Sequence, residues 1–253
     1  VDASQLNLTS IALASISGGN GALSDYQLNT SNLSLSASIT PATISAIGGL
    51  VAQNKVYNQT NTATLDTSGA TFTGRISNDQ LAINSYAAQF ASENVSRGTG
   101  GSVQPQTVTA SGFTLTGTSA SNYQLAQNLS INALSASITP KALTITNSTA
   151  AGRDYDGTTT AVITPGTITG FEGNETVSLA RAIGVFDSKN IGARTATATY
   201  VLANGTNGEL ASNYSLAPST GLAATITAKT VSLSASKVYN GSTDLDRKST
   251  RLN

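Results

Sequence analysis

Two carboxylates flank a tyrosine in the middle of the chain, where Asp154, Tyr155 and Asp156 follow one another. Calcium binding and glycoside hydrolysis both use paired carboxylates, and Asp187 would add a further oxygen ligand. The related segments carry Asn58 and Asn240 in place of Asp156, and no loop is rich enough in Asp to fill a calcium shell. We therefore expect Asp156 to cap a turn, with calcium binding and a glycosidase pair as the alternatives.

The composition removes most other catalytic chemistry. The chain has no Cys and no His, so it lacks thiolate nucleophiles, disulfides, the usual general base near neutral pH and a Ser-His-Asp triad. A serine–lysine arrangement is compatible with the composition, but no motif supports it. Lysines lie near the expected module joints, at Lys55, Lys141, Lys229 and Lys237, and we expect their charged groups to remain in solvent. An intramolecular isopeptide bond between lysine and asparagine is the alternative. We expect no enzymatic activity and no cofactor.

Three short markers recur in the same order, about ninety residues apart. The first is centred on Tyr57, Tyr155 and Tyr239, the second on Tyr26, Tyr123 and Tyr214, and the third is an Ile-Thr-Pro segment ending at Pro41 and Pro140, with a looser copy at 225–228. A repeat of this length can form its own core. The expected units are 1–41 (the C-terminal part of a repeat), 42–140 and 141–229 (complete repeats), and 230–253 (the N-terminal part of another, with an aberrant tail after Leu245).

The marker tyrosines are expected to have structural roles. We expect each ring to pack on the core of its module with its hydroxyl bonded to the backbone, and stacking on a ligand is the alternative. Gly157 and Gly241 complete Asp-Gly and Asn-Gly pairs, which accept positive φ and close tight turns. Gln59 stands at the equivalent position of the first copy, so the geometry of that turn is open.

Apolar and hydroxyl-bearing residues alternate with a period of two, which is typical of half-buried strands. The segments 78–90 and 174–186 are also expected to be strands. Short strands separated by tight turns predict an all-β fold of tandem small antiparallel sandwich-like modules, immunoglobulin-like or related. Because the next strand begins directly after each Ile-Thr-Pro segment, we expect a stiff, elongated array. The alternating series are 33–40, 222–226 and the set Val177, Leu179, Ile183 and Val185.

The low charge and the lack of long apolar runs each exclude one kind of partner. Only 10% of the residues are charged and the net charge is zero. A nucleic-acid-binding protein would show a basic stripe, so we expect no nucleic-acid partner. No run of about 18 apolar residues is present, so we expect no membrane span.

The segment from Tyr155 to Thr160 reads Tyr-Asp-Gly-Thr-Thr-Thr and resembles the YDG-type repeat of large secreted bacterial proteins. The segments 186–192, 212–216 and 138–141 resemble the middle and the end of that repeat. The resemblance covers nearly the whole chain. It implies tandem β modules of a filamentous-haemagglutinin-like exoprotein or adhesin, located outside the cell or on the bacterial surface.

The function implied is that of a structural and adhesive stalk. Such modules would contact neighbouring repeats, project a distal binding region, and bind host or matrix glycans or proteins weakly and many times over. A dedicated glycan-binding module is the alternative, and it would require an exposed aromatic platform. Solvent exposure of Tyr86, Tyr200 and Phe113 would favour that alternative.

Overall fold

The computed structural model describes residues 21–27, 38–234, 236, 238, 239 and 241. These residues form strands with almost no helix, so the all-β prediction is confirmed. Three single 3-10 turns are present, η1 (Leu23–Asp25), η2 (Ala120–Asn122) and η3 (Ala211–Asn213). In the described part of the chain, no helix has the length and apolar character needed to cross a membrane. Most of the series 33–40 and the tail after Leu245 lie outside the described residues.

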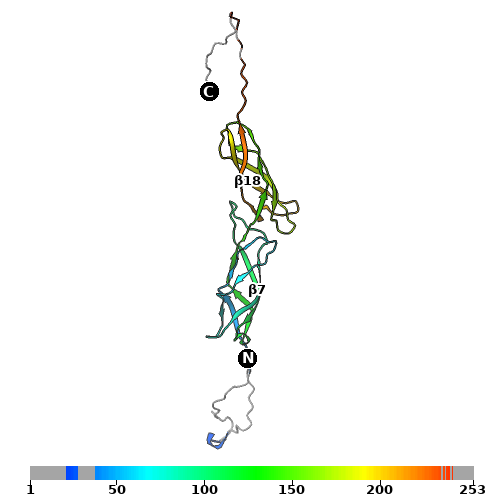
Figure 1. Ribbon diagram of the computed structural model, residues 1–253. Helices are drawn as coiled ribbons and strands as arrows, with labels where there is room; N and C mark the ends of the chain where they lie inside the picture. Colours follow the sequence, from blue (N-terminus) through cyan, green and yellow to red (C-terminus); the bar gives the residue numbers. More distant parts are fainter. Residues whose placement is uncertain (1–20, 28–37, 235, 237, 240, 242–253) are drawn as a thin grey trace. The chain divides into compact units, whose positions relative to one another are not determined.

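The chain divides into two compact units. Unit 1 comprises Val1–Lys141 together with Ser212–Tyr214, and unit 2 comprises Ala142–Ala211 and Ser215–Asn253. Figure 1 labels the longest strand of each unit, β7 in unit 1 and β18 in unit 2. A hydrophobic core of its own is consistent with the size of each unit.

Unit 1 contains two three-stranded sheets, one with the order β5-β1-β8 and the other β6-β7-β9. Two short pairs, β2 with β4 and β3 with β10, complete it. The pairs β1–β8 and β3–β10 are parallel, whereas β6–β7 is a long antiparallel hairpin. The strands are β1 (Ala42–Gly48), β2 (Val51–Ala52), β3 (Lys55–Val56), β4 (Leu65–Asp66), β5 (Thr71–Thr73), β6 (Ala82–Phe90), β7 (Gln106–Thr116), β8 (Tyr123–Ile131), β9 (Leu134–Ala136) and β10 (Ile138–Thr139).

The later strands repeat much of this order. A five-stranded sheet runs β13-β20-β18-β17-β14, beside a sheet β16-β11-β19 and a pair β12–β15. Because β13 and β20 are parallel, the prediction of purely antiparallel modules is wrong in both units. The strands are β11 (Lys141–Thr146), β12 (Thr149–Ala150), β13 (Arg153–Asp154), β14 (Thr160–Ala161), β15 (Ile163–Thr164), β16 (Thr167–Thr169), β17 (Ser178–Phe186), β18 (Gly192–Ala203), β19 (Tyr214–Leu216) and β20 (Ser219–Thr227).

The core of unit 2 forms around the ring of Phe186, at the end of β17. Phe186 and Ile226 are 2% and 1% exposed, and both lie in one buried cluster with Ala161 and Ala196. Leu222 and Ala224 pack against this cluster, which confirms the face predicted from the alternation in 222–226. Over 222–226, β20 therefore contributes every second side chain to the core.

The apolar face predicted for 177–185 is confirmed at Val177 and Leu179, which are buried and half-buried, but it is wrong after the middle of β17. Ile183 and Val185 are 41% and 49% exposed, whereas Gly184 and Phe186 are buried. The pairing with β18 shifts register between Leu179 and Arg181, and an extra residue in a strand moves the following side chains to the opposite face. The strand therefore buries its aromatic ring rather than its β-branched residues.

The strand predicted for 78–90 begins later than expected. Asn78 has φ 72°, and the Asp79 N–H donates to the Ile76 carbonyl at 3.2 Å. This turn interrupts the extended backbone, so β6 begins at Ala82. Similarly, β17 begins at Ser178 rather than at position 174.

Candidate functional site: a repeated tyrosine turn

The sequence around Tyr155 forms a tight turn directly after β13. The Tyr155 N–H donates to the Thr227 carbonyl at 2.8 Å, which continues the parallel pairing of β13 with β20. The Thr227 hydroxyl lies 3.3 Å from the Arg153 carbonyl and 2.5 Å from Oδ1 of Asp154. The first and third sequence markers therefore lie side by side in unit 2.

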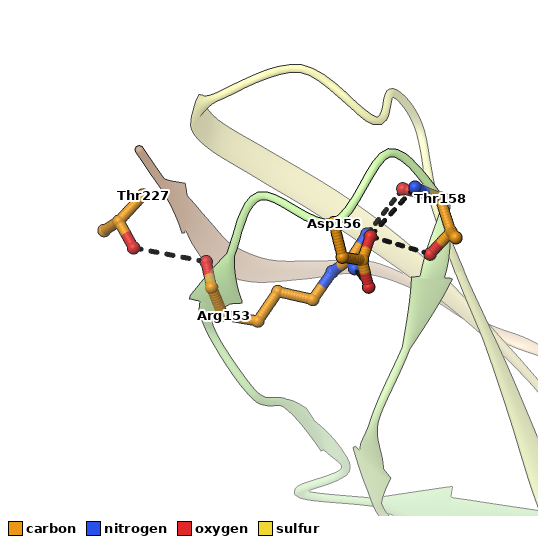
Figure 2. A network of polar contacts seen from close by, with 4 residues as sticks. All are labelled: Arg153, Asp156, Thr158 and Thr227. Carbon is orange, nitrogen blue, oxygen red and sulfur yellow. Dashed lines mark hydrogen bonds and ion pairs between the residues drawn. The ribbon is translucent and has the colours of Figure 1, made fainter. Parts of the chain in front are cut away.

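Four polar side chains hold this turn, as Figure 2 shows. Oδ1 of Asp156 accepts hydrogen bonds from the backbone N–H and the hydroxyl of Thr158, at 2.8 and 2.9 Å. Nη2 of Arg153 donates to the Thr158 carbonyl at 2.5 Å, and the same guanidinium forms an ion pair with Asp156. The guanidinium also lies 5.5 Å from the centre of the Phe186 ring, within the range of a cation–π interaction. The turn is thereby attached to the core.

Unit 1 builds the same turn from different residues. Asn58 replaces the aspartate, and its Oδ1 accepts from the backbone N–H and the hydroxyl of Thr60 at 3.3 and 2.9 Å. Lys55 replaces the arginine: its Nζ donates to the Thr60 carbonyl at 2.5 Å and lies 5.6 Å from the centre of the Phe90 ring. Desolvation lowers the pKa of Lys55, partly opposed by the charge of Glu93. We call both structures, residues 55–60 and 153–158, the tyrosine turn.

The main chain of the unit 1 turn is closed in the same way. The Tyr57 N–H donates to the Thr139 carbonyl at 2.9 Å, and the Thr139 hydroxyl donates to the Lys55 carbonyl at 3.2 Å. Thr139 belongs to the Ile-Thr-Pro segment that was expected to mark the module boundary. The segment therefore has a second role, because it closes the tyrosine turn of its own unit.

The YDG domain matches residues 40–130 and 139–221 of the chain. The chain belongs to the YDG domain family. No curated protein and no solved structure shows significant similarity to it. Each matched segment contains one tyrosine turn with the same hydrogen-bond pattern, so the turn is shared by both YDG domains of this chain.

The open question about Gln59 is answered by its backbone. Gln59 has φ 59° and Gly157 has φ 82°, so both occupy the left-handed region at the same position of the turn. The first YDG domain therefore keeps the turn geometry without Asp or Gly. The side chain of Gln59 makes this conformation less favourable than it is for glycine, because a Cβ atom disfavours left-handed backbone.

Replacing Gln59 with glycine is expected to stabilise unit 1 by about 1 kcal/mol, since the strain at this position is relieved. Replacing Gly157 with alanine is the matched variant in unit 2, where open space surrounds the position of the new Cβ. It should destabilise unit 2 by a similar amount, about 1 kcal/mol. Native-state hydrogen exchange measures both units in one sample. Destabilisation by Gln59→Gly would contradict this account of the turn.

The marker tyrosines divide into two groups. Tyr57, Tyr123 and Tyr214 are buried, as expected, but Tyr26, Tyr155 and Tyr239 are 51%, 36% and 89% exposed, so the expectation that each ring packs on a core is wrong for these three. Tyr57 is buried partly because the Tyr214 ring meets it edge-on, with 5.6 Å between ring centres and an angle of 77° between the planes. Exposure therefore depends on what covers the ring.

Gly241, two residues after Tyr239, has φ 83°, which confirms the positive φ expected at this position.

Tyr123 holds a turn of the first YDG domain through its hydroxyl. The hydroxyl donates to Oδ2 of Asp79 at 2.5 Å and accepts from the Ile76 N–H at 2.8 Å. Desolvation, followed by the hydrogen bond to Asp79, raises the pKa of Tyr123. The neutral phenol is therefore the form that the fold requires.

The stability of unit 1 is expected to fall as the pH rises above about 10, the ordinary pKa of tyrosine. In that range the unfolded chain loses the Tyr123 proton while the folded chain keeps it, so ionisation favours the unfolded state. The fall should continue up to the raised pKa of the folded protein. Hydrogen exchange or urea unfolding across this pH range checks the result. Tyr123→Phe should flatten the dependence of unit 1 stability on pH in this range. An unchanged slope would contradict the assignment of this dependence to Tyr123.

The acidic residues that suggested metal or glycosidase chemistry lie in separate hydrogen bonds. Asp154 contacts Thr227, Asp156 caps its turn, and Asp187 accepts from the Thr195 N–H at 3.4 Å. The described residues contain no group of three or more acidic side chains placed to hold a metal ion. Asp156 therefore organises the backbone of its turn, and Asp154 links β13 to the Thr227 side chain at the end of β20.

The three aromatic residues that would favour a glycan platform are not available for one. Tyr200 and Phe113 are each 8% exposed. Tyr86 is half-buried, and its hydroxyl bonds to both the N–H and the carbonyl of Leu65, at 2.9 and 3.1 Å. These rings contribute to the interior of the YDG domains.

Sequence reasoning missed two parts of the tyrosine turn. One is the cation over a phenylalanine, Lys55 over Phe90 and Arg153 over Phe186. A signal for it exists, since a basic residue occurs two positions before the tyrosine in all three copies of the first marker, the third being Lys237. The other part is the threonine five residues after the cation, Thr60 or Thr158, whose hydroxyl bonds to the capping side chain.

Proposed function

We propose that these two YDG domains form a stalk segment of a large secreted or surface-anchored bacterial protein of the filamentous-haemagglutinin-like kind. One observation carries the proposal: the polar side chains of the tyrosine turn bind groups of their own unit, in both copies. The turn therefore stabilises its module and leaves no assembled reactive group. In such a stalk, sandwich-like modules would extend a binding region from the cell and contact host or matrix glycans or proteins weakly.

The parallel strand pairs support a role under tension. Both β10 and the end of β20 pair in parallel with the strand that leads into a tyrosine turn. The hydrogen bonds of a β ladder run across the strands. A pull along the terminal strand would therefore load these bonds together, instead of opening them one after another as at the free end of a hairpin.

The array can be tested with spin labels because the chain has no native Cys. Thr109 in β7 and Thr197 in β18 are exposed. Nitroxide labels on cysteines introduced at both positions would report the distance between the two units by double electron–electron resonance. We expect a single narrow distance distribution. A reference pair within unit 2, at Thr169 and Thr197, gives the width for a rigid body. A distribution several times broader than this reference would contradict the stiff stalk.

A further inference from the structure

A short corner of the chain fits into unit 1 although its neighbours in sequence belong to unit 2. This corner is Ser212–Tyr214, and its Asn213 is only 1% exposed. Oδ1 of Asn213 accepts from the Val95 N–H at 2.9 Å, and Nδ2 donates to Oδ1 of Asn94 at 2.8 Å. Both the oxygen and the nitrogen of the Asn213 amide therefore have hydrogen-bond partners in unit 1. Burial of a polar amide requires such partners.

Two further contacts complete this arrangement in unit 1. The Tyr214 ring packs edge-on against Tyr57, and Nη2 of Arg97 donates to the Ser212 carbonyl at 2.7 Å. Under the corner, Tyr57 and Val95 are 2% and 6% exposed. We call the residues that receive the corner, Tyr57, Asn94 and Val95, the socket of unit 1.

Unit 2 has an equivalent socket, formed by Tyr155, Asn190 and Ile191. The local geometry repeats: the Asn190 N–H donates to Oγ of Ser188 at 3.2 Å, as the Asn94 N–H does to Oγ of Ser92 at 3.1 Å. Here, however, Tyr155 and Ile191 are 36% and 54% exposed. They line a hollow that is completed by Ala228, Lys229 and Val231. An apolar surface that is buried in one copy of a repeat thus lies open in the other.

The chain also carries a second corner of this kind. Ser121–Tyr123 repeats the sequence Ser-Asn-Tyr, and its first two residues lie in the 3-10 turn η2, as Ser212 and Asn213 lie in η3. Tyr123 is buried in unit 1, whereas Ser121 and Asn122 are exposed. The third related segment, Ser24–Tyr26, has Asp25, which lacks an amide donor and accepts from the Ala22 N–H. We propose that the socket of unit 2 binds the Ser121–Tyr123 corner of a second copy of this chain, with Asn122 in the role of Asn213.

This association is heterologous, because the corner and the socket are different surfaces in different units. Within the described residues, each copy therefore has one free corner and one free socket, and association continues from copy to copy. The contact is small, so the expected affinity is weak, with a Kd between about 0.1 and 1 mM. Sedimentation equilibrium of the full chain over this concentration range should show dimers and larger species.

Three variants of the full chain test the proposal. Asn122→Ala removes the amide that would enter the socket, and Ile191→Arg places a charge in the socket. Both positions are exposed, so folding should be unaffected. Each change should weaken self-association at least about tenfold, as expected when a buried polar group loses its partner or a charge enters an apolar contact. Ile183→Arg is the control: it places the same charge on another exposed isoleucine of unit 2 and should change the association by less than about twofold.

Mixing the two defective variants gives a sharper result. A chain with Asn122→Ala keeps its socket, and a chain with Ile191→Arg keeps its corner, so a mixture should form a one-to-one dimer and nothing larger. A wild-type chain that is monomeric throughout the range would overturn the proposal. Association that survives Asn122→Ala, or a mixture that stays monomeric, would also overturn it, since another occupant of the socket would then be responsible.

Discussion

Phe186→Ala is expected to destabilise unit 2 by about 3–5 kcal/mol, which is the usual cost of removing a buried aromatic ring from a core. The ring is 2% exposed and lies in the cluster with Ala161, Ala196 and Ile226. These neighbours come from three different strands, which restricts how far the site can collapse around a cavity. This loss is a large part of the free energy of unfolding of a domain of this size, which is about 4–13 kcal/mol.

The two-unit chain supplies an internal reference for this measurement. Hydrogen exchange of the amides in β17 and β18 reports unit 2, and exchange in β6 and β7 reports unit 1. Phe186→Leu is the matched variant and should cost less than about 1.5 kcal/mol because it keeps most of the volume. A loss below about 1 kcal/mol for Phe186→Ala, or an equal loss in both units, would contradict the core described here.

Arg153→Ala is expected to destabilise unit 2 by about 2–3 kcal/mol, from a charge-assisted hydrogen bond and a cation–π contact. The side chain is 17% exposed, so water replaces its lost contacts poorly. The partner Asp156 is 51% exposed, and the ion pair itself therefore adds little. Most of the effect should come from the Thr158 carbonyl, which loses its donor, and from the uncovered face of Phe186.

The chain itself suggests the controls for Arg153. Unit 1 has lysine at the equivalent position with the same acceptor and the same ring geometry, so Arg153→Lys should cost less than about 1 kcal/mol. Unit 1 also has asparagine in place of Asp156, and Asp156→Asn should cost less than about 0.5 kcal/mol. If Arg153→Lys were as damaging as Arg153→Ala, the equivalence of the two tyrosine turns would be wrong. Hydrogen exchange resolves these differences unit by unit.

Local patterns predicted the elements better than their pairing. The alternation in 222–226 identified both β20 and its buried face, and β11 followed the Ile-Thr-Pro segment as expected. The face predicted for the second half of β17 was wrong because a register shift depends on the partner strand, which the sequence of β17 does not specify. Parallel pairing of β3 with β10 joins residues more than eighty positions apart, and no short-range signal specifies such a contact.

The tyrosine turn was predictable in its chemistry but not in its surroundings. Asp156 as a turn cap follows from residue type and the adjacent glycine. The different fates of Tyr57 and Tyr155, which are 2% and 36% exposed, do not follow from sequence. Both stand at the same place in the repeat, and what differs is the ring of Tyr214 over one of them.

Pulling the full chain from its two ends in single-molecule force spectroscopy tests the stalk most directly. The account predicts two separate unfolding events, one for each unit, each adding roughly 300 Å of extended chain for about ninety residues. Arg153→Ala should lower the force of one event and leave the other unchanged. Extension without resolved force peaks would contradict a role in bearing tension, because the parallel strand pairs would then resist no more than an unfolded chain does.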